Sequence, residues 1–225
     1  MVNIQIDVND LESKLQAMSQ IVEHAFEMSV TSFVNADRFK AREVIDGDKP
    51  INAFEIEIDN LIFDLLAFSG KTLVPDSLRM ILSIQKINPM LERIGDHAVN
   101  IAESAETISS QSGEYNLYEL RLMANKCRWI LHDSLQSFFG RNLMLAEDVL
   151  RRDEEIDKLN VATIANVKAD VLSESNLSFE TAVEIIRISR NLERIADLSL
   201  NIAEESVFSN MGRIVKHGEM EGVKL

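Results

Sequence analysis

Apolar residues recur at spacings of three and four along most of the chain, which is the period of an amphipathic α-helix. The first such run spans residues 11–33. A second run covers residues 51–65, and Pro50 marks a kink or a restart just before it. After a loop at residues 69–77, a third run extends from about residue 78 to residue 108. The pattern therefore predicts three long helices in the first half of the chain.

The same pattern starts again after the polar stretch SSQSGEYN, residues 109–116. An offset of 105 relates the first helix to the second half, and an offset of 101 relates Glu92 to Glu193. One loop of the second half is therefore four residues shorter, which a surface connection tolerates. We predict an all-α fold of two tandem three-helix bundles with six long helices, covering residues 1–112 and 113–225. The positions related by the larger offset include Leu15 with Leu120, Met18 with Met123, Ser29 with Ser134, Ser32 with Ser137, and Phe33 with Phe138.

Composition limits what such a bundle binds. The net charge of −14 disfavours a nucleic-acid partner, because phosphate contacts are made by clusters of Lys and Arg. No apolar run approaches the roughly 18 residues of a membrane span, and the N-terminal residues do not resemble a secretory signal. We therefore expect a cytoplasmic protein without membrane insertion, whose partners are cations or basic protein surfaces. The single cysteine, Cys127, is interpreted as a buried packing residue.

Acidic residues repeat together with the helices. The segments LERIGDHAVNIAE, residues 91–103, and LERIADLSLNIAE, residues 192–204, are identical at nine of thirteen positions. On a helix, Glu92 and Asp96 lie on one narrow stripe, away from the apolar face. The preceding helix carries a similar stripe, and antiparallel packing would bring the two together. This second stripe consists of Asp48, Asn52, Glu55 and Asp59.

Two interpretations of these stripes follow from electrostatics. Like charges one helical turn apart destabilise a helix by a few tenths of a kcal/mol per pair, so facing stripes favour a multivalent cation between them. Carboxylates without Cys or His prefer hard cations such as Ca²⁺, Mg²⁺, Mn²⁺ or ferric iron. The alternative is a solvated acidic face on a very acidic protein. The sequence alone leaves both interpretations open.

The two LERI-containing segments, and the D-x-x-[IV]-[ND] helices before them, resemble the PhoU family of phosphate-uptake regulators over nearly the whole chain. The resemblance implies paired three-helix bundles that carry multinuclear metal clusters, with iron or zinc as the first expectation and Mn, Mg or Ca as alternatives. It also implies a cytoplasmic regulator that acts on the ATPase subunit of a Pst phosphate transporter and on a PhoR-type sensor kinase. A homodimer is a further expectation.

The family's acidic motifs can be carried over position by position. Under the offset of 105, Glu55 and Asp59 correspond to Asn160 and Ile164, so the second site lacks two carboxylates and is expected to be smaller, weaker or absent. His97 could add a nitrogen ligand, but a structural or exposed histidine is the favoured interpretation. The expected metal ligands are Asp48, Glu55, Asp59, Glu92 and Asp96 in the first half, and Asp153, Asp157, Glu193 and Asp197 in the second.

Two rival functions remain at this stage. Di-iron carboxylate enzymes are also helical bundles, but they use Glu-x-x-His, and no histidine of this chain has a glutamate three residues before it. The sequence has no Gly-x-x-x-x-Gly-Lys phosphate loop and no convincing pair of nucleophile and base. We therefore expect a protein that is not an enzyme. A metal-independent helical adaptor is the second alternative.

Overall fold

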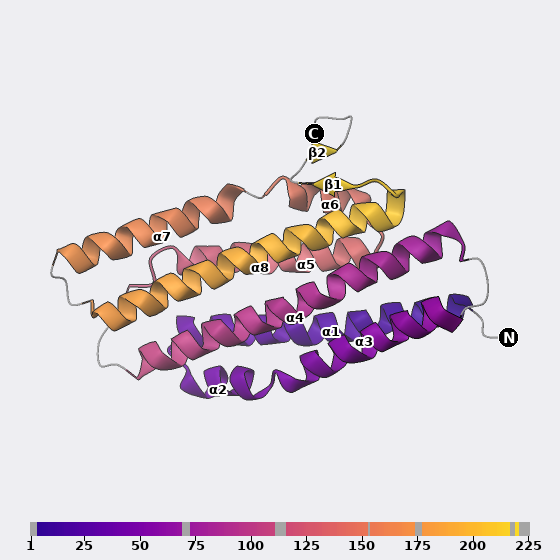
Figure 1. Ribbon diagram of the computed structural model, residues 1–225. Coiled ribbons are helices and arrows are strands. Elements are labelled where there is room, and N and C mark those ends of the chain that lie inside the picture. Colours follow the sequence, from indigo (N-terminus) through magenta and orange to yellow (C-terminus); the bar gives the residue numbers. More distant parts are fainter. Residues whose placement is uncertain are drawn as a thin grey trace.

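The computed structural model describes residues 4–68, 73–110, 116–152, 154–173, 177–216 and 219–220 (Figure 1). The helices in these ranges are α1 Ile4–Val34, α2 Arg38–Asp46, α3 Lys49–Phe68, α4 Pro75–Ser109, α5 Leu120–Phe139, α6 Leu143–Leu150, α7 Glu154–Leu172 and α8 Phe179–Met211. A short antiparallel hairpin follows, formed by β1 Val215–Lys216 and β2 Glu219–Met220. The all-α prediction is confirmed. None of the helices in the described ranges has the length and hydrophobicity of a membrane span.

Each half begins with one long helix and ends with another, and the middle helix is divided into a short and a long part. The breaks lie between α2 and α3 and between α6 and α7. A left-handed turn precedes both short helices, because Ala36 has φ 51° and Arg141, its equivalent at an offset of 105, has φ 50°. The next residues, Asp37 and Asn142, cap α2 and α6 with their side-chain oxygens. Both halves therefore keep the same turn despite its backbone strain.

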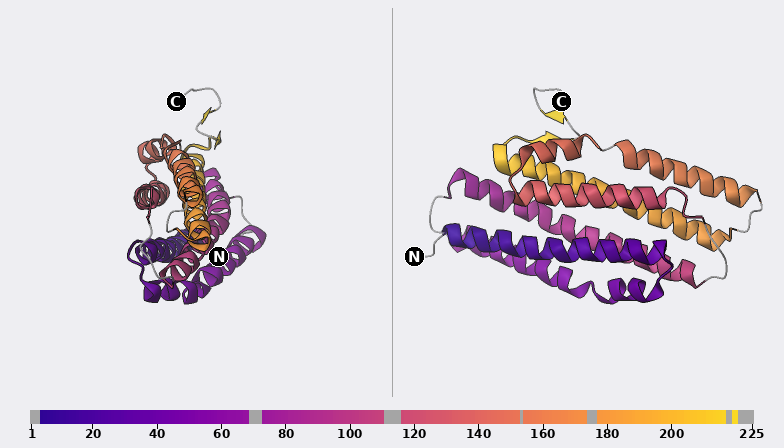
Figure 2. Two further views of the ribbon diagram at one scale, coloured as in Figure 1. Left: turned by 90° about the vertical axis from the view of Figure 1, so that its left-hand side faces the viewer. Right: turned by 180° about the vertical axis from the view of Figure 1, so that it is seen from behind.

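The long helices form two layers. In Figure 1, α3, α4, α8 and α7 lie side by side toward the viewer, with α4 and α8 in the centre. The view from behind in Figure 2 shows α1 and α5 covering this layer on its other side. The two halves therefore meet along two helix pairs, α4 with α8 and α1 with α5.

A continuous hydrophobic core joins the halves. Buried apolar residues of α1, α3 and α4 and of α5 to α8 belong to the same contact cluster. The predicted apolar face of α4 is fully buried, from Ile84 through Leu91 to Ala98. Cys127 is buried as predicted and donates from Sγ to the backbone oxygen of Leu192, and burial raises the pKa of its thiol. The predicted boundary between residues 112 and 113 lies outside the described residues.

Ion pairs support the second contact between the halves, along α1 and α5. Arg128 binds Glu27 through two bonds, at 2.6 Å from Nε and 3.0 Å from Nη2. His132 Nδ1 lies 3.0 Å from Glu23 Oε1. The bidentate pair of Arg128 and Glu27 adds geometric specificity, although exposed ion pairs stabilise a protein little. We infer that these contacts set the register of α1 against α5, while the apolar core supplies most of the stability.

Replacing Ile94 by alanine is expected to destabilise both halves together. Ile94 is fully buried on α4 at the centre of the shared core, and such truncations cost about 2–5 kcal/mol. Cys127, the single cysteine, is fully buried on α5 in the second half, so reaction of its thiol with a labelling reagent reports unfolding there. The urea concentration at which this thiol becomes reactive should fall as far as the midpoint followed by circular dichroism.

Ile56 provides the matched control, because it is an exposed isoleucine on α3. Its replacement by alanine should change stability by less than about 0.5 kcal/mol. If the Cys127 thiol of Ile94→Ala becomes reactive only at the urea concentration of the parent, the halves unfold independently, contrary to a shared core.

Candidate functional site

Five carboxylates of the first half gather at one place, and we name them the first acidic cluster: Asp48, Glu55, Asp59, Glu92 and Asp96. Asp48 lies at the elbow between α2 and α3, the next two residues lie on α3, and the last two lie on α4. Helices α3 and α4 run antiparallel and pack against each other (Figure 1). The two acidic stripes therefore meet between adjacent helices.

Electrostatic coupling shows how close these groups are. Burial, then the charges of Asp59 and Asp96, raise the pKa of the Glu55 carboxyl. Burial, then the charges of Asp96 and Glu55, raise the pKa of the Glu92 carboxyl. Burial and like charge both disfavour the ionised form of a carboxyl group. Carboxylates from α3 and α4 thus repel one another across the helix pair.

Hydrogen bonds satisfy only part of the first acidic cluster. Asn52 Nδ2 donates to Asp48 Oδ2 at 2.8 Å, and Asn88 Nδ2 donates to Asp59 Oδ1 at 3.0 Å. The other oxygen of Asp48, Oδ1, is buried and receives no hydrogen bond within the described ranges. The donor set therefore consists of oxygen atoms with excess negative charge, which fits a hard cation.

The described side chains are not arranged around a shared metal position. No three His, Cys, Asp or Glu residues in the described ranges lie close enough together to hold a metal ion. A cation would draw side chains such as Glu92 and Asp96 together and add to the positive charge of Arg93, which does not offset burial and like charge at Glu92. Iron, zinc or another metal at this place stays a prediction.

The raised pKa of Glu92 predicts how metal-free stability depends on pH. A carboxyl whose pKa rises on folding contributes stability below its ordinary pKa of 4.5, and this contribution is lost as pH rises through the folded-state pKa. Replacing Glu92 by Gln should therefore stabilise the metal-free protein at neutral pH by a few tenths of a kcal/mol. Below the ordinary pKa the variant and the parent should be equal. Urea unfolding with a chelator present measures both conditions.

A control of opposite sign is available on the same helix. Hydrogen bonding to Arg42 holds the pKa of Glu106 below its ordinary value. Glu106→Gln should therefore reduce stability at neutral pH. The repulsion between the stripes is disproved if Glu92→Gln also reduces stability there.

The second acidic cluster, comprising Asp153, Asp157, Glu193 and Asp197, is built differently. Asp153 lies outside the described residues, Asp157 is exposed on α7, and Glu193 and Asp197 lie on α8. Asn160, which stands where the first half has Glu55, is buried and accepts a hydrogen bond from Ser189 Oγ at 2.7 Å.

The partner of Asn160 has changed together with it. Ser189 is the equivalent of Asn88 at an offset of 101. In the first half, Asn88 donates to the backbone oxygen of Glu55 and to the Asp59 carboxylate. In the second half, a neutral pair of Ser189 and Asn160 occupies this position. The second half has thus replaced a charged contact by an uncharged one, and a weaker metal site there stays a prediction.

Polar residues near the first acidic cluster bind the other half of the chain. His97 Nδ1 lies 2.9 Å from Asn191 Oδ1 on α8, and burial lowers the pKa of His97. Arg187 of α8 donates to Asn100 Oδ1 and to Glu103 Oε2, both at 2.7 Å. His97 is therefore a structural residue, as favoured from the sequence. Sequence reasoning missed Arg187, although its equivalent Lys86 also pairs with the opposite helix, with Glu205 at 2.7 Å.

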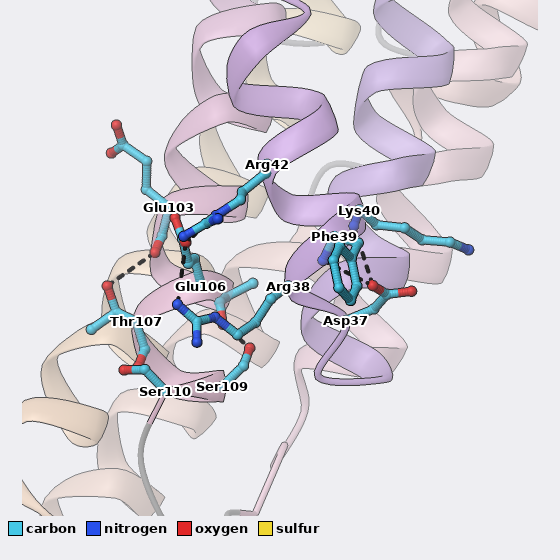
Figure 3. Close-up of polar contacts among 11 residues, drawn as sticks. Asp37, Arg38, Phe39, Lys40, Arg42, Glu103, Glu106, Thr107, Ser109 and Ser110 are labelled. Atoms are coloured by element: carbon cyan, nitrogen blue, oxygen red, sulfur yellow. Dashed lines mark hydrogen bonds and ion pairs between the residues drawn. The ribbon is translucent and has the colours of Figure 1, made fainter.

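The short helix α2 presents a distinct surface at the end of the first half (Figure 3). Arg42 Nε binds Glu106 Oε1 of α4 at 2.8 Å, and Arg38 Nη2 reaches the same oxygen at 3.5 Å. These exposed ion pairs add to an apolar contact, in which buried Ala41 and Val44 of α2 pack against Ala102 of α4. Asp37 caps the helix, and the ring of Phe39 points away from the bundle with 89% of its surface exposed. Phe39 is therefore displayed by a firmly held helix.

Comparison with known sequences identifies close relatives along nearly the whole chain. A phosphate-specific transport system accessory protein PhoU homolog of Clostridium acetobutylicum is 29% identical over 93% of this chain and 94% of its own length. The homolog of Pseudomonas putida is 31% identical over 94% of this chain and 82% of its own length. The PhoU accessory protein of Escherichia coli K12 is 26% identical over 94% and 86%.

Solved structures agree with these relatives. The crystal structure of PhoU from Pseudomonas aeruginosa matches with a TM-score of 0.88 and 27% identity, over 93% of this chain and all of that one. The crystal structure of the phosphate transport system regulatory protein PhoU from Streptococcus pneumoniae has the same fold, with a TM-score of 0.86 and 24% identity over 95% of this chain and all of that one. The PhoU domain model matches the chain twice, at residues 15–105 and 120–206. The chain belongs to the PhoU family.

Proposed function

We propose that this chain is a cytoplasmic accessory protein of a phosphate-specific transport system, and that it regulates uptake and signalling by docking to other proteins. Its relatives carry the name of phosphate-specific transport accessory proteins. In this proposal the partners are the ATPase subunit of a Pst-type transporter and a PhoR-type sensor kinase. No chemical step is assigned to the chain. A homodimer is part of the proposal, and light scattering on the purified protein tests it.

The observation that carries the docking proposal is a set of exposed apolar side chains that repeats in both halves. Phe39 on α2 corresponds to Met144 on α6, and they are 89% and 81% exposed. Ile56 on α3 corresponds to Val161 on α7, at 63% and 67%. Leu66 with Val171, and Leu78 with Phe179, are two further exposed pairs.

Single exposed apolar residues are normal and call for no function. These residues, however, differ in identity between the halves while remaining apolar and exposed at equivalent positions. Their neighbours have changed in character, since Arg38 and Arg42 correspond to Leu143 and Glu147. Because the repeated exposed positions stay apolar while their neighbours change, they support a surface that is covered by a partner protein.

In this proposal, a metal ion orders part of the docking surface and does not itself contact the partner. The first acidic cluster lies between α3 and α4, and Ile56 is the residue next to Glu55 on α3. A cation that draws α3 and α4 together would order this part of the docking surface. If chelation leaves partner binding unchanged, the chain acts as a metal-independent adaptor, which is the second candidate.

Deletion of the gene tests the proposed function in cells. Without the docking protein, phosphate uptake or the associated kinase should be active even when phosphate is ample. The measurement is phosphate uptake together with a reporter of the phosphate response, in a strain without a second gene of this family. Normal control in the deletion strain would refute the functional proposal.

A further inference from the structure

The short helix α2 carries basic side chains on both sides of its exposed phenylalanine ring (Figure 3). Arg38 and Arg42 lie on one side of Phe39, and Lys40 extends on the other. The side chain of Arg42 is 65% exposed and that of Arg38 is 47% exposed. We name this surface the α2 face, and it consists of Arg38, Phe39, Lys40 and Arg42. It places three cations around an apolar ring on a chain whose net charge is −14.

The cations of the α2 face are only partly neutralised. Arg42 Nε lies 2.8 Å from Glu106 Oε1, and Arg38 Nη2 lies 3.5 Å from the same oxygen. Two guanidinium groups therefore share one carboxylate and together keep one positive charge. The side chain of Lys40 forms no hydrogen bond or ion pair within the described ranges. The α2 face thus has charge available for an anionic partner.

The acids of α2 do not cancel this charge. Asp37 accepts hydrogen bonds from two backbone amides at the start of the helix, at 3.1 Å and 3.2 Å. With Asp37 and Glu106 counted, three cations still face two carboxylates. The other acids of the helix, Glu43 and Asp46, follow the basic residues toward its C-terminal end. The start of α2 therefore remains positive.

The second half keeps the apolar side chain at this place and has lost the cations. The offset of 105 carries Phe39 onto Met144, which is also exposed. The same offset carries the three basic residues onto uncharged or acidic ones, Leu143, Leu145 and Glu147. The two equivalent surfaces therefore share an apolar anchor but have opposite charge.

Attachment of α2 to α4 explains only part of this difference. At the offset of 101, Glu106 corresponds to Val207, which is buried, so the second half has an apolar contact where the first has an ion pair. One arginine would be enough to pair with Glu106. Lys40 binds no carboxylate that could have been lost. The second arginine and the lysine are thus in excess of what holds the helix.

We propose that the α2 face binds an acidic segment of a partner protein, whose apolar side chain packs on Phe39 and whose carboxylates pair with Arg42 and Lys40. Aromatic and arginine side chains are enriched in the centres of protein interfaces. An anionic membrane fits less well, because the whole chain is strongly negative and a membrane presents a wide negative surface. The inference deepens the proposed docking function and rests on it, and it implies that the two halves recognise different chemistry.

Titration of the full, chelator-treated chain with the peptide acetyl-EELEE-amide, followed by amide NMR, tests the proposal. Salt at about 150 mM screens the distant charges of the chain but leaves close contacts. Saturable shifts are expected at Phe39 and Lys40, and none at Met144 and Leu145. Lys40→Glu should weaken binding about fivefold or more, because an attractive contact becomes repulsive. Lys168→Glu, which changes the net charge equally at an exposed position of α7, should leave binding unchanged.

Two further arms use the parent chain, so they do not depend on the folding of a variant. The neutral peptide acetyl-QQLQQ-amide should bind about fivefold more weakly or less, since it offers no charge. Vesicles of phosphatidylglycerol should not bind the chain. Absence of saturable shifts with the acidic peptide, equal shifts on α6, equal binding by Lys40→Glu or equal binding of the neutral peptide would each overturn the proposal. Binding to the vesicles that Lys40→Glu abolishes would also overturn it, because lipid would then be the occupant.

The partner chemistry and the docking function can fail separately. If the chain binds the ATPase subunit but not the acidic peptide, docking stands and the chemistry proposed for the α2 face is wrong. If the acidic peptide binds as expected while deletion of the gene leaves phosphate control normal, the α2 face is an acidic-peptide site and the proposed function is wrong.

Discussion

Replacing Glu92 and Asp96 together by alanine is expected to remove the metal that we propose for the first half of the chain. These two side chains are the contribution of α4 to the first acidic cluster, and affinity for hard cations depends on the number and charge of the oxygen ligands. The helices should remain intact, because neither side chain belongs to the buried face of α4. Elemental analysis of the full chain, purified without added metal, measures the loss.

The second half provides the matched comparison for this variant. Replacing Glu193 and Asp197 by alanine changes the equivalent positions of α8, where Asn160 and Ile164 already stand in place of two carboxylates. Relative to the parent, the variant at Glu193 and Asp197 should lose less metal than the variant at Glu92 and Asp96. If the variant at Glu92 and Asp96 keeps the full metal content of the parent, the ligand assignment is wrong.

Replacing Phe39 and Met144 together by serine is expected to abolish control of phosphate uptake without unfolding the protein. Both side chains are almost fully exposed, so their loss should change stability by less than about 0.5 kcal/mol. Truncating an apolar anchor at the centre of an interface costs about 2 kcal/mol or more in binding, which is about 30-fold per anchor. Uptake in cells that carry the variant should therefore resemble uptake in the deletion strain.

Leu122→Ser is the control for this variant. Leu122 is also an exposed apolar residue, on α5, but Ala17 is its equivalent in the first half, so it belongs to none of the repeated pairs. It should retain normal control. Equal loss of control in both variants would show that exposed apolar residues act here in general, and not through the repeated surface.

The helices could be predicted from the sequence because hydrophobic spacing reflects burial directly. The run predicted from about residue 78 to residue 108 is α4, Pro75–Ser109. Helix α1 begins earlier than the predicted start at residue 11, because Ile4 and Val8 continue the spacing toward Leu11. The meeting of the acidic stripes was also predictable, since it needs only a short loop and antiparallel packing.

The contacts between the halves could not be predicted in the same way. Periodicity shows that a face of α4 is buried, but it does not show which part of that face meets α8. Asn100 and Glu103 continue the helical spacing of Glu92 and Asp96, but the sequence does not show that Arg187 of α8 binds both of them. Likewise, the substitution at Asn160 was visible in the sequence, but its hydrogen bond to Ser189 depends on the packing of α7 against α8.

Binding of the purified chain to the isolated ATPase subunit of the Pst-type transporter tests the docking account most directly. A titration followed by light scattering or calorimetry would compare the parent chain, the Phe39→Ser and Met144→Ser double variant, and Leu122→Ser. The account predicts saturable binding by the parent and by Leu122→Ser, and binding at least about 30-fold weaker by the double variant. Absence of binding by the parent, or equal binding by all three proteins, would contradict it.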